Sequence, residues 1–215
     1  MALIAGGAPE QKACLRDVLL PRLDNASPLL REVAASCLSR TLAHDLVVAG
    51  DFTRLFRILQ SEDVRIREPI IKGLQGHIQG SEEATRRRLV DAGILPATLQ
   101  AYTSTKDDIL NFISACVLPI LGPSFTQNDG GLTLFPLLMH GEPRIRAATI
   151  QAFKNAMDSR HGNMENMAKA CVIGTLHPLT KTDDAVRDLW CRILPKTVAF
   201  LENRVEIDIL FGSLK

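Results

Sequence analysis

The chain has 215 residues, of which 46% are hydrophobic and 23% charged, and its formal net charge is +1. This composition can build a packed core and excludes a disordered chain, and the near-neutral charge argues against a protein that neutralises many nucleic-acid phosphates. Aromatic residues make up only 5% of the chain, which is low for a β-sandwich, whereas the abundant leucine, alanine and arginine favour helices.

The sequence lacks the features that identify several other classes of protein. The five cysteines are scattered and none has the spacing of a zinc site, so we expect reduced thiols and no metal. The first ten residues, MALIAGGAPE, do not resemble a signal peptide. The longest apolar run, around FISACVLPIL, is too short to span a bilayer and contains Pro119. The sequence therefore predicts a cytoplasmic protein, with the nucleus as an alternative location, and no membrane partner.

An apolar pattern recurs five times along the chain. Each copy has an anchor residue, an apolar residue eight positions later and, in most copies, another twelve positions later, which together form one stripe of an α-helix. Three positions before each anchor stands a residue suited to the start of a helix. In chain order the anchors are Leu30, Ile66, Leu110, Ile145 and Val186, and the preceding residues are Ser27, Asp63, Asp107, Glu142 and Asp183.

A second predicted helix comes before each of these, joined to it by a short polar segment such as QSED or STKD. The anchors lie 35 to 44 residues apart, which is typical of helical repeats. The longer intervals leave room for an extra helix at SEEATRRRLVDAG and GNMENMAKACVIG. The sequence thus predicts repeats over approximately 10–45, 50–80, 81–123, 130–160 and 162–200, and a C-terminal cap over 201–215.

Three prolines fall inside the predicted anchor helices. Pro119 and Pro195 lie nine positions after their anchors, and an interior proline removes a backbone hydrogen bond, so we expect broken helices there. Pro69 lies six positions after Asp63, which predicts a late start or a bend in the second repeat.

Two segments carry a family resemblance. DAGILPATLQAYTSTKDDILNFISACVL resembles an armadillo repeat, with Gly-Ile-x-Pro opening its second helix, and RIRAATIQAFKNAM resembles the armadillo third helix, ending near Asn155. The resemblance to the ARM/HEAT family covers about residues 10 to 200. It implies an all-α protein, a right-handed α-solenoid superhelix of about five repeats that forms a single domain, of a kind found in eukaryotes.

The resemblance also implies a groove lined by the third helices, which binds a protein or peptide. Only Asn155 matches the asparagine ladder of peptide-binding members, and Trp190 falls on a core position, which argues against an importin-like receptor. Basic side chains suit an acidic or phosphorylated segment, although a solvated helix face is the simpler interpretation of each one. The candidate groove residues are Arg40, Lys72, Lys154, Asn155, Arg192 and Lys196.

An arginine follows four of the five anchors. We expect these arginines to form a structural ladder with acids of the next repeat, for which Asp63, Asp107, Glu142 and Asp183 are the candidates. The short basic run Arg86–Arg88 is the only other concentration of positive charge, and nucleic-acid binding is not expected.

The predicted function is non-catalytic binding of a protein or peptide by a scaffold or adaptor. No metalloprotease, nucleophile-elbow or P-loop motif occurs, so we expect no catalytic residues and no cofactor. The alternative is an enzyme or small-molecule-binding protein with a cavity built from several repeats. The C-terminal segment AFLENRVEIDILFGSLK is expected to cap the array or to join two copies of the chain.

Overall fold

The computed structural model describes residues 17–103, 105–125, 131–158 and 184–197. Within these ranges every regular element is helical and none is a strand, so the all-α prediction is confirmed. The chain divides into two compact units, residues 1–112 and residues 113–215. Three predictions lie outside the described residues: the helix that precedes the fifth anchor, the extra helix at GNMENMAKACVIG and the C-terminal cap.

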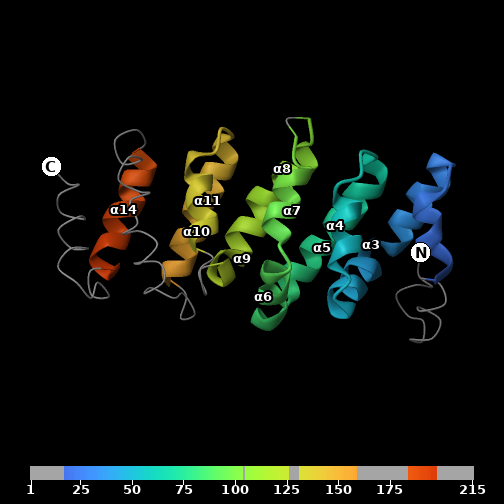
Figure 1. Ribbon diagram of the computed structural model, residues 1–215, viewed down its shortest axis with the longest axis horizontal. Helices are drawn as coiled ribbons and strands as arrows, with labels where there is room; N and C mark the ends of the chain where they lie inside the picture. Colours follow the sequence, from blue (N-terminus) through green and yellow to red (C-terminus); the bar gives the residue numbers. More distant parts are fainter. Residues whose placement is uncertain (1–16, 104, 126–130, 159–183, 198–215) are drawn as a thin grey trace. The chain divides into compact units, whose positions relative to one another are not determined.

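Unit 1 consists of helical hairpins (Figure 1). The long helix α3 packs mainly on α5, and α4 contacts α3, α5 and α7. The expected extra helix of SEEATRRRLVDAG is present as α6, and Gly93, in the left-handed conformation at φ 85°, separates it from α7. The elements are η1 (Leu20–Asp24), α3 (Pro28–Ala49), α4 (Phe52–Leu59), α5 (Val64–Gly80), α6 (Glu83–Asp91), α7 (Ile94–Ala101) and α8 (Asp107–Phe112).

Unit 2 is built around α11. This helix packs most closely on α9 and also contacts η2, η4 and α14. Phe135 and Phe153 stack between η4 and α11 with ring centroids 4.9 Å apart. The described elements are η2 (Ile113–Val117), α9 (Leu118–Phe125), α10 (Gly131–Leu134), η4 (Phe135–Met139), α11 (Pro143–Asp158) and α14 (Asp184–Thr197).

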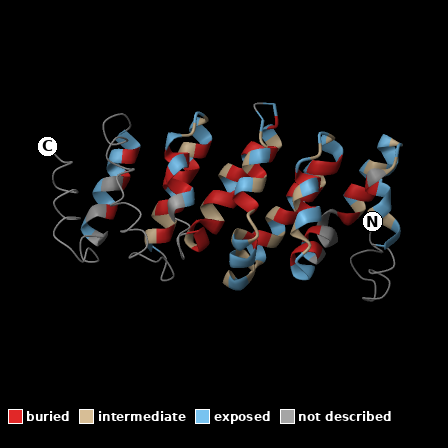
Figure 2. Cartoon of the chain, in the orientation of Figure 1, coloured by how far each residue is buried: buried red, intermediate tan, exposed pale blue. Residues whose placement is uncertain are grey.

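The predicted anchors form the core. Ile66, Leu110, Ile145 and Val186 are all buried, which confirms the apolar stripe (Figure 2). Leu30 differs, because 45% of its surface is exposed and its neighbours Leu29 and Val33 are exposed as well. The first copy of the pattern is therefore only partly covered by the described residues.

The prolines act differently from one another. Before Pro119 the chain forms the π-helical segment η2, because the proline offers no N–H to the carbonyl of Ala115. The helical run nevertheless continues through Pro119 as α9, so the expected break is wrong and the proline is accommodated by a local π-helical turn. Similarly, α5 begins directly after Asp63 despite Pro69, and α14 continues past Pro195 to Thr197, so the late start and the second break are wrong.

The continuous helical run over Asp107–Phe125 is long and apolar enough to cross a membrane by length and composition. Sequence reasoning considers only its apolar centre and finds it too short. However, 61% of the apolar window is buried inside the protein, which is what the core helix of a folded domain shows. The length of this helix is thus weak evidence for a membrane span.

Candidate binding surface

The predicted groove residues fall in both units. Lys72 lies on α5 in unit 1, and Lys154, Asn155 and Arg192 lie on α11 and α14 in unit 2. Arg40 lies on α3 and Lys196 on α14, but their side chains are outside the described part of the structure.

In unit 2 the structure brings two predicted cations together. Asp188 on α14 lies between them, with its Oδ2 atom 3.7 Å from Lys154 Nζ and 3.2 Å from Arg192 Nε. Arg192 is one turn after Asp188 on the same helix, whereas Lys154 reaches it from α11. One carboxylate is therefore shared by two cations. We call Lys154, Asn155, Asp188 and Arg192 the α11–α14 ridge.

Asn155 has an internal role that sequence reasoning does not anticipate. Its Nδ2 donates to the carbonyl of Pro119 at 2.8 Å, and its Oδ1 accepts from Gln151 Nε2 at 2.7 Å. In an α-helix the Pro119 carbonyl would accept from residue 123, but residue 123 is a proline and has no N–H. Asn155 thus supplies a donor that α9 lacks. One amide hydrogen and one oxygen lone pair remain for a ligand.

Replacing Asn155 with alanine should lower the free energy of unfolding by about 1–3 kcal/mol, because the carbonyl of Pro119 loses its donor. Urea denaturation followed by circular dichroism would measure the change. Gln151→Ala is the matched control. The exposed side chain of Gln151 donates to Oδ1 of Asn155 and not to the carbonyl of Pro119, so its replacement should change the free energy of unfolding by no more than about 0.5 kcal/mol. Equal effects of the two variants would contradict this role of Asn155.

Lys72 is an exposed cation that is already paired. Its Nζ lies 2.7 Å from Glu68 Oε1 one turn earlier on α5, and the side chains of Lys72 and Glu68 are 71% and 49% exposed. An ion pair of this kind contributes little to stability, and it leaves the site nearly neutral. Lys72 therefore shows no feature beyond a solvated helix face.

The predicted arginine ladder is present in unit 1, with one correction. Arg31 reaches Asp63 of the next hairpin at 3.1 Å, as expected. The repeat pattern predicts that Arg67 reaches Asp107, but Arg67 pairs with Asp108 instead, with Nε at 2.7 Å from Oδ2 and Nη2 at 3.0 Å from Oδ1. The fork of the guanidinium thus meets both oxygens of one carboxylate.

Three of the four arginines that follow the anchors also hold the loop that precedes their own helix. Arg31 donates to the carbonyls of Asn25 and Ala26, Arg67 to that of Ser61, and Arg146 to those of His140 and Gly141. Three copies share this contact, so the recurring arginine stabilises the turn between two helices. For Arg146 the expected acidic partner, Asp183, lies outside the described residues.

A second, smaller group of charges lies beside the Arg67–Asp108 pair. Lys106 is buried, and its Nζ donates to Glu62 Oε1 at 2.7 Å, although Glu62 is itself 86% exposed. The hydrogen bond and charge of Lys106 lower the pKa of Glu62. Burial alone would raise the pKa of Asp108, but the hydrogen bonds and charge of Arg67 outweigh it, and the pKa is lowered. Both carboxylates are therefore held in their charged forms.

Two histidines meet between α3 and α5. His44 Nδ1 and His77 Nδ1 are 3.2 Å apart, and the rings are at 78° to each other. Such a bond requires one nitrogen to accept, so at least one ring is neutral. Burial, together with the charge of His44, lowers the pKa of His77. The Nε2 atom of His77 is buried and has no hydrogen-bond partner among the described residues. The lowered pKa of His77 therefore favours the neutral form of that ring in the contact.

In the described part of the chain, no three histidine, cysteine, aspartate or glutamate side chains lie close enough together to hold a metal ion. The His44–His77 pair lacks a third ligand there.

Comparison with known proteins gives a fold likeness. No protein-family model matches the chain, and no curated protein matches it. Among solved structures, the chain is similar to the crystal structure of an engineered protein, with 17% identity and a TM-score of 0.50 over 93% of this chain and 84% of that one. A second engineered protein has 17% identity and a TM-score of 0.48 over 93% and 51%. At this identity the likeness concerns the fold alone.

Proposed function

We propose that the chain is a non-catalytic binding module of the ARM/HEAT kind, a right-handed solenoid of about five helical repeats that binds an acidic or phosphorylated protein segment. Four observations support the solenoid: the recurrent hairpins, the buried anchors, the arginines that reach the next hairpin, and the helical fold shared with an engineered protein.

The observation that carries the binding proposal is the α11–α14 ridge. Lys154 and Arg192 come from two successive anchor helices and share the single carboxylate of Asp188, so one positive charge is in excess. The side chain of Arg192 is 61% exposed and that of Lys154 is 29% exposed. Beside them, the remaining hydrogen-bonding capacity of Asn155 suits a peptide backbone. A phosphate or carboxylate on that peptide would displace Asp188 from one of the cations.

The double charge reversal Lys154→Glu with Arg192→Glu should weaken binding of acidic peptides by about tenfold or more. The probes are fluorescein-labelled acidic twelve-residue peptides, with phosphoserine counterparts and amide isosteres, and binding is followed by fluorescence anisotropy. The melting temperature should change little, because both side chains lie at the surface.

The matched control is Arg144→Glu with Arg187→Glu. These arginines lie near the starts of the same two helices, are exposed, and give the same change in charge. Loss of binding in the ridge variant alone supports the proposal. Equal loss in both variants would mean that only the net charge matters, and retained binding in the ridge variant would overturn the proposal.

A further inference from the structure

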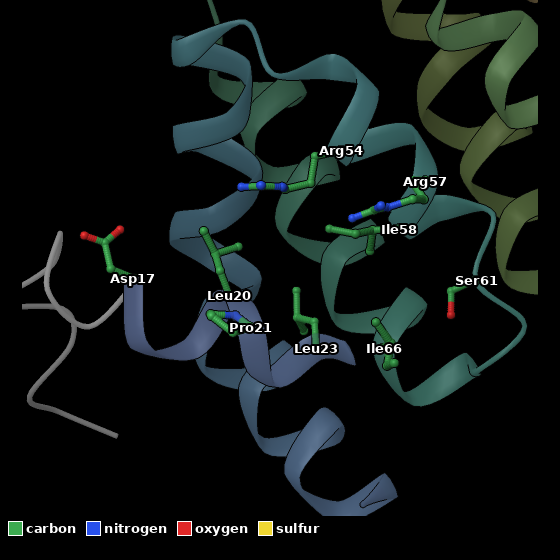
Figure 3. A pocket seen from close by; sticks show the side chains of 9 residues that line it. All are labelled: Asp17, Leu20, Pro21, Leu23, Arg54, Arg57, Ile58, Ser61 and Ile66. Carbon is green, nitrogen blue, oxygen red and sulfur yellow. The ribbon is translucent and has the colours of Figure 1, made fainter. Parts of the chain in front are cut away.

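Unit 1 contains a pocket that is separate from the predicted groove. It lies between η1, α4 and the start of α5, and it has a volume of about 560 Å³ (Figure 3). The predicted groove uses the anchor helices, whereas this pocket is formed mainly by the helices that precede them in each hairpin. The volume falls within the range of about 300–1,000 Å³ that is typical of ligand sites.

The inner wall of the pocket is apolar. Leu23, Ile58 and Ile66 come from three different elements and are each less than a tenth exposed, yet all three line the cavity. Leu20 and Pro21 extend this wall along η1. An apolar side chain that enters the pocket would therefore contact aliphatic groups from η1, α4 and α5, and its burial would favour binding.

Two arginines stand over the apolar wall. Arg54 and Arg57 are one turn apart on α4, and Figure 3 shows both side chains extending across the pocket toward η1. Arg54 has a long contact of 3.7 Å with Asp51, and its side chain is 45% exposed. Arg57 is exposed and has no hydrogen-bond or ion-pair partner among the described residues. Arg57 is thus a cation available to a ligand.

The acids near the pocket do not neutralise Arg57. Asp51 caps α4 by accepting from the backbone N–H of Arg54, and its one described ion pair is with the same residue. Asp17 lies at the far rim, and in Figure 3 its side chain is on the opposite side of Leu20 from Arg57. The charge that faces the pocket is therefore positive.

We propose that this pocket binds a short acidic peptide segment with a bulky apolar side chain. The apolar side chain packs against Leu23, Ile58 and Ile66, and neighbouring Asp or Glu side chains pair with Arg54 and Arg57. Two guanidinium groups one helical turn apart match two carboxylates on one peptide better than the single carboxylate of a fatty acid. The segment thus combines an apolar anchor with charged contacts at the rim.

The test uses the full chain and the labelled peptide Glu-Asp-Leu-Phe-Glu-Asp, with fluorescence anisotropy as the readout. Two comparison peptides separate the contributions: one has amides in place of the acids, and the other has serines in place of Leu-Phe. We expect each comparison peptide to bind at least about tenfold more weakly than the parent. Equal binding of all three peptides would overturn the proposal.

Arg57→Glu should weaken binding of the parent peptide by about tenfold or more, because an attractive contact becomes repulsive. Arg87→Glu is the matched control: Arg87 is an exposed arginine on α6 of the same unit, it does not line the pocket, and its replacement should leave affinity within about twofold. Circular dichroism would confirm that both variants fold. Equal losses in the two variants, or no loss in Arg57→Glu, would refute the site.

Two further arms identify the ligand class and separate this site from the α11–α14 ridge. Dodecanoate should not displace the peptide at concentrations at which the unlabelled peptide does, and displacement by dodecanoate would contradict the choice of a peptide. In the Lys154→Glu with Arg192→Glu variant, the parent peptide should still bind at least about tenfold more tightly than the peptide with serines in place of Leu-Phe, because the apolar wall of the pocket is unchanged. Loss of this preference in that variant would assign the peptide to the ridge instead of the pocket.

Discussion

Asp108→Ala is expected to lower the free energy of unfolding by about 3–5 kcal/mol, the largest effect of any single substitution considered for this protein. The guanidinium of Arg67 is almost fully buried, with a side-chain exposure of 5%, and Asp108 is the carboxylate that neutralises it through two hydrogen bonds. Without Asp108, a charged group stays in the interior, and the carbonyl of Ser61 is its one remaining hydrogen-bond partner among the described residues. Chemical denaturation of the full chain would measure the loss.

Asp107→Ala is the matched control for this prediction. Asp107 is the adjacent acid, it is exposed, and it is the residue that the repeat pattern selects as the partner of Arg67. Replacing Asp107 should lower the free energy of unfolding by less than about 1 kcal/mol. A double variant, Arg67→Met with Asp108→Leu, should be more stable than Asp108→Ala alone, because no unpaired charge remains. If Asp107→Ala proved the more damaging, the observed pairing would be refuted.

The same pair should produce a dependence of stability on pH. Because the pKa of Asp108 is lower in the folded chain than its ordinary value of 3.8, its stabilising contribution is present above that value and is lost as the pH falls through the folded pKa. In Asp108→Ala this part of the acid-induced loss should be absent. The difference in stability between the parent chain and the variant should therefore shrink at acidic pH.

Gly122→Leu is expected to destabilise the chain by about 3 kcal/mol, although leucine is a far better helix former than glycine. A Cβ atom at this position would lie 2.9 Å from both Cα and Cβ of Ala152 and 3.0 Å from its carbonyl oxygen. Two of these are backbone atoms of α11, so they cannot move as a side chain would. The two helices would have to separate, and the packing of the unit 2 core would be lost.

Gly76→Leu tests the same substitution without the clash. Gly76 lies inside α5, and beyond its own stretch of helix no heavy atom is within 4 Å of the place that a Cβ atom would occupy. The gain in helix propensity should then dominate and raise the stability by up to about 1 kcal/mol. Thermal and urea denaturation of both variants would give the comparison. Similar effects of the two substitutions would show that close packing of Gly122 is unimportant.

The periodic features of this fold are predictable from the sequence. Apolar residues at helical spacing identify Ile66, Leu110, Ile145 and Val186 as buried, because burial depends on the face of the helix on which a residue lies. The repeat pattern also correctly predicts that Asp63 starts α5 and that it pairs with Arg31. These properties repeat from hairpin to hairpin, so one copy supports the interpretation of the next.

The particular contacts of single repeats are not predictable in this way. The partner of Arg67 is Asp108 and not Asp107, because the choice between adjacent acids depends on the local start of α8. To predict the hydrogen bond between Asn155 and Pro119, one must know which carbonyl lacks a donor and which side chain of another helix lies near it. Gly122 departs from the apolar pattern because α11 approaches closely at that point, and spacing carries no information about this distance.

The arginine contacts make each hairpin of unit 1 depend on the hairpin that follows it, which affects how the chain tolerates truncation. Arg31 donates to the backbone of the turn before its own helix and also pairs with an acid of the following hairpin, and Arg67 does the same. The turns that contain Asn25 and Ser61 are therefore held partly by contacts with the next hairpin. A fragment that ends after one hairpin would leave its last arginine without its acid. A cut after either the first or the second hairpin of unit 1 would therefore leave Arg31 or Arg67 without its carboxylate, so neither truncation keeps all of the native contacts.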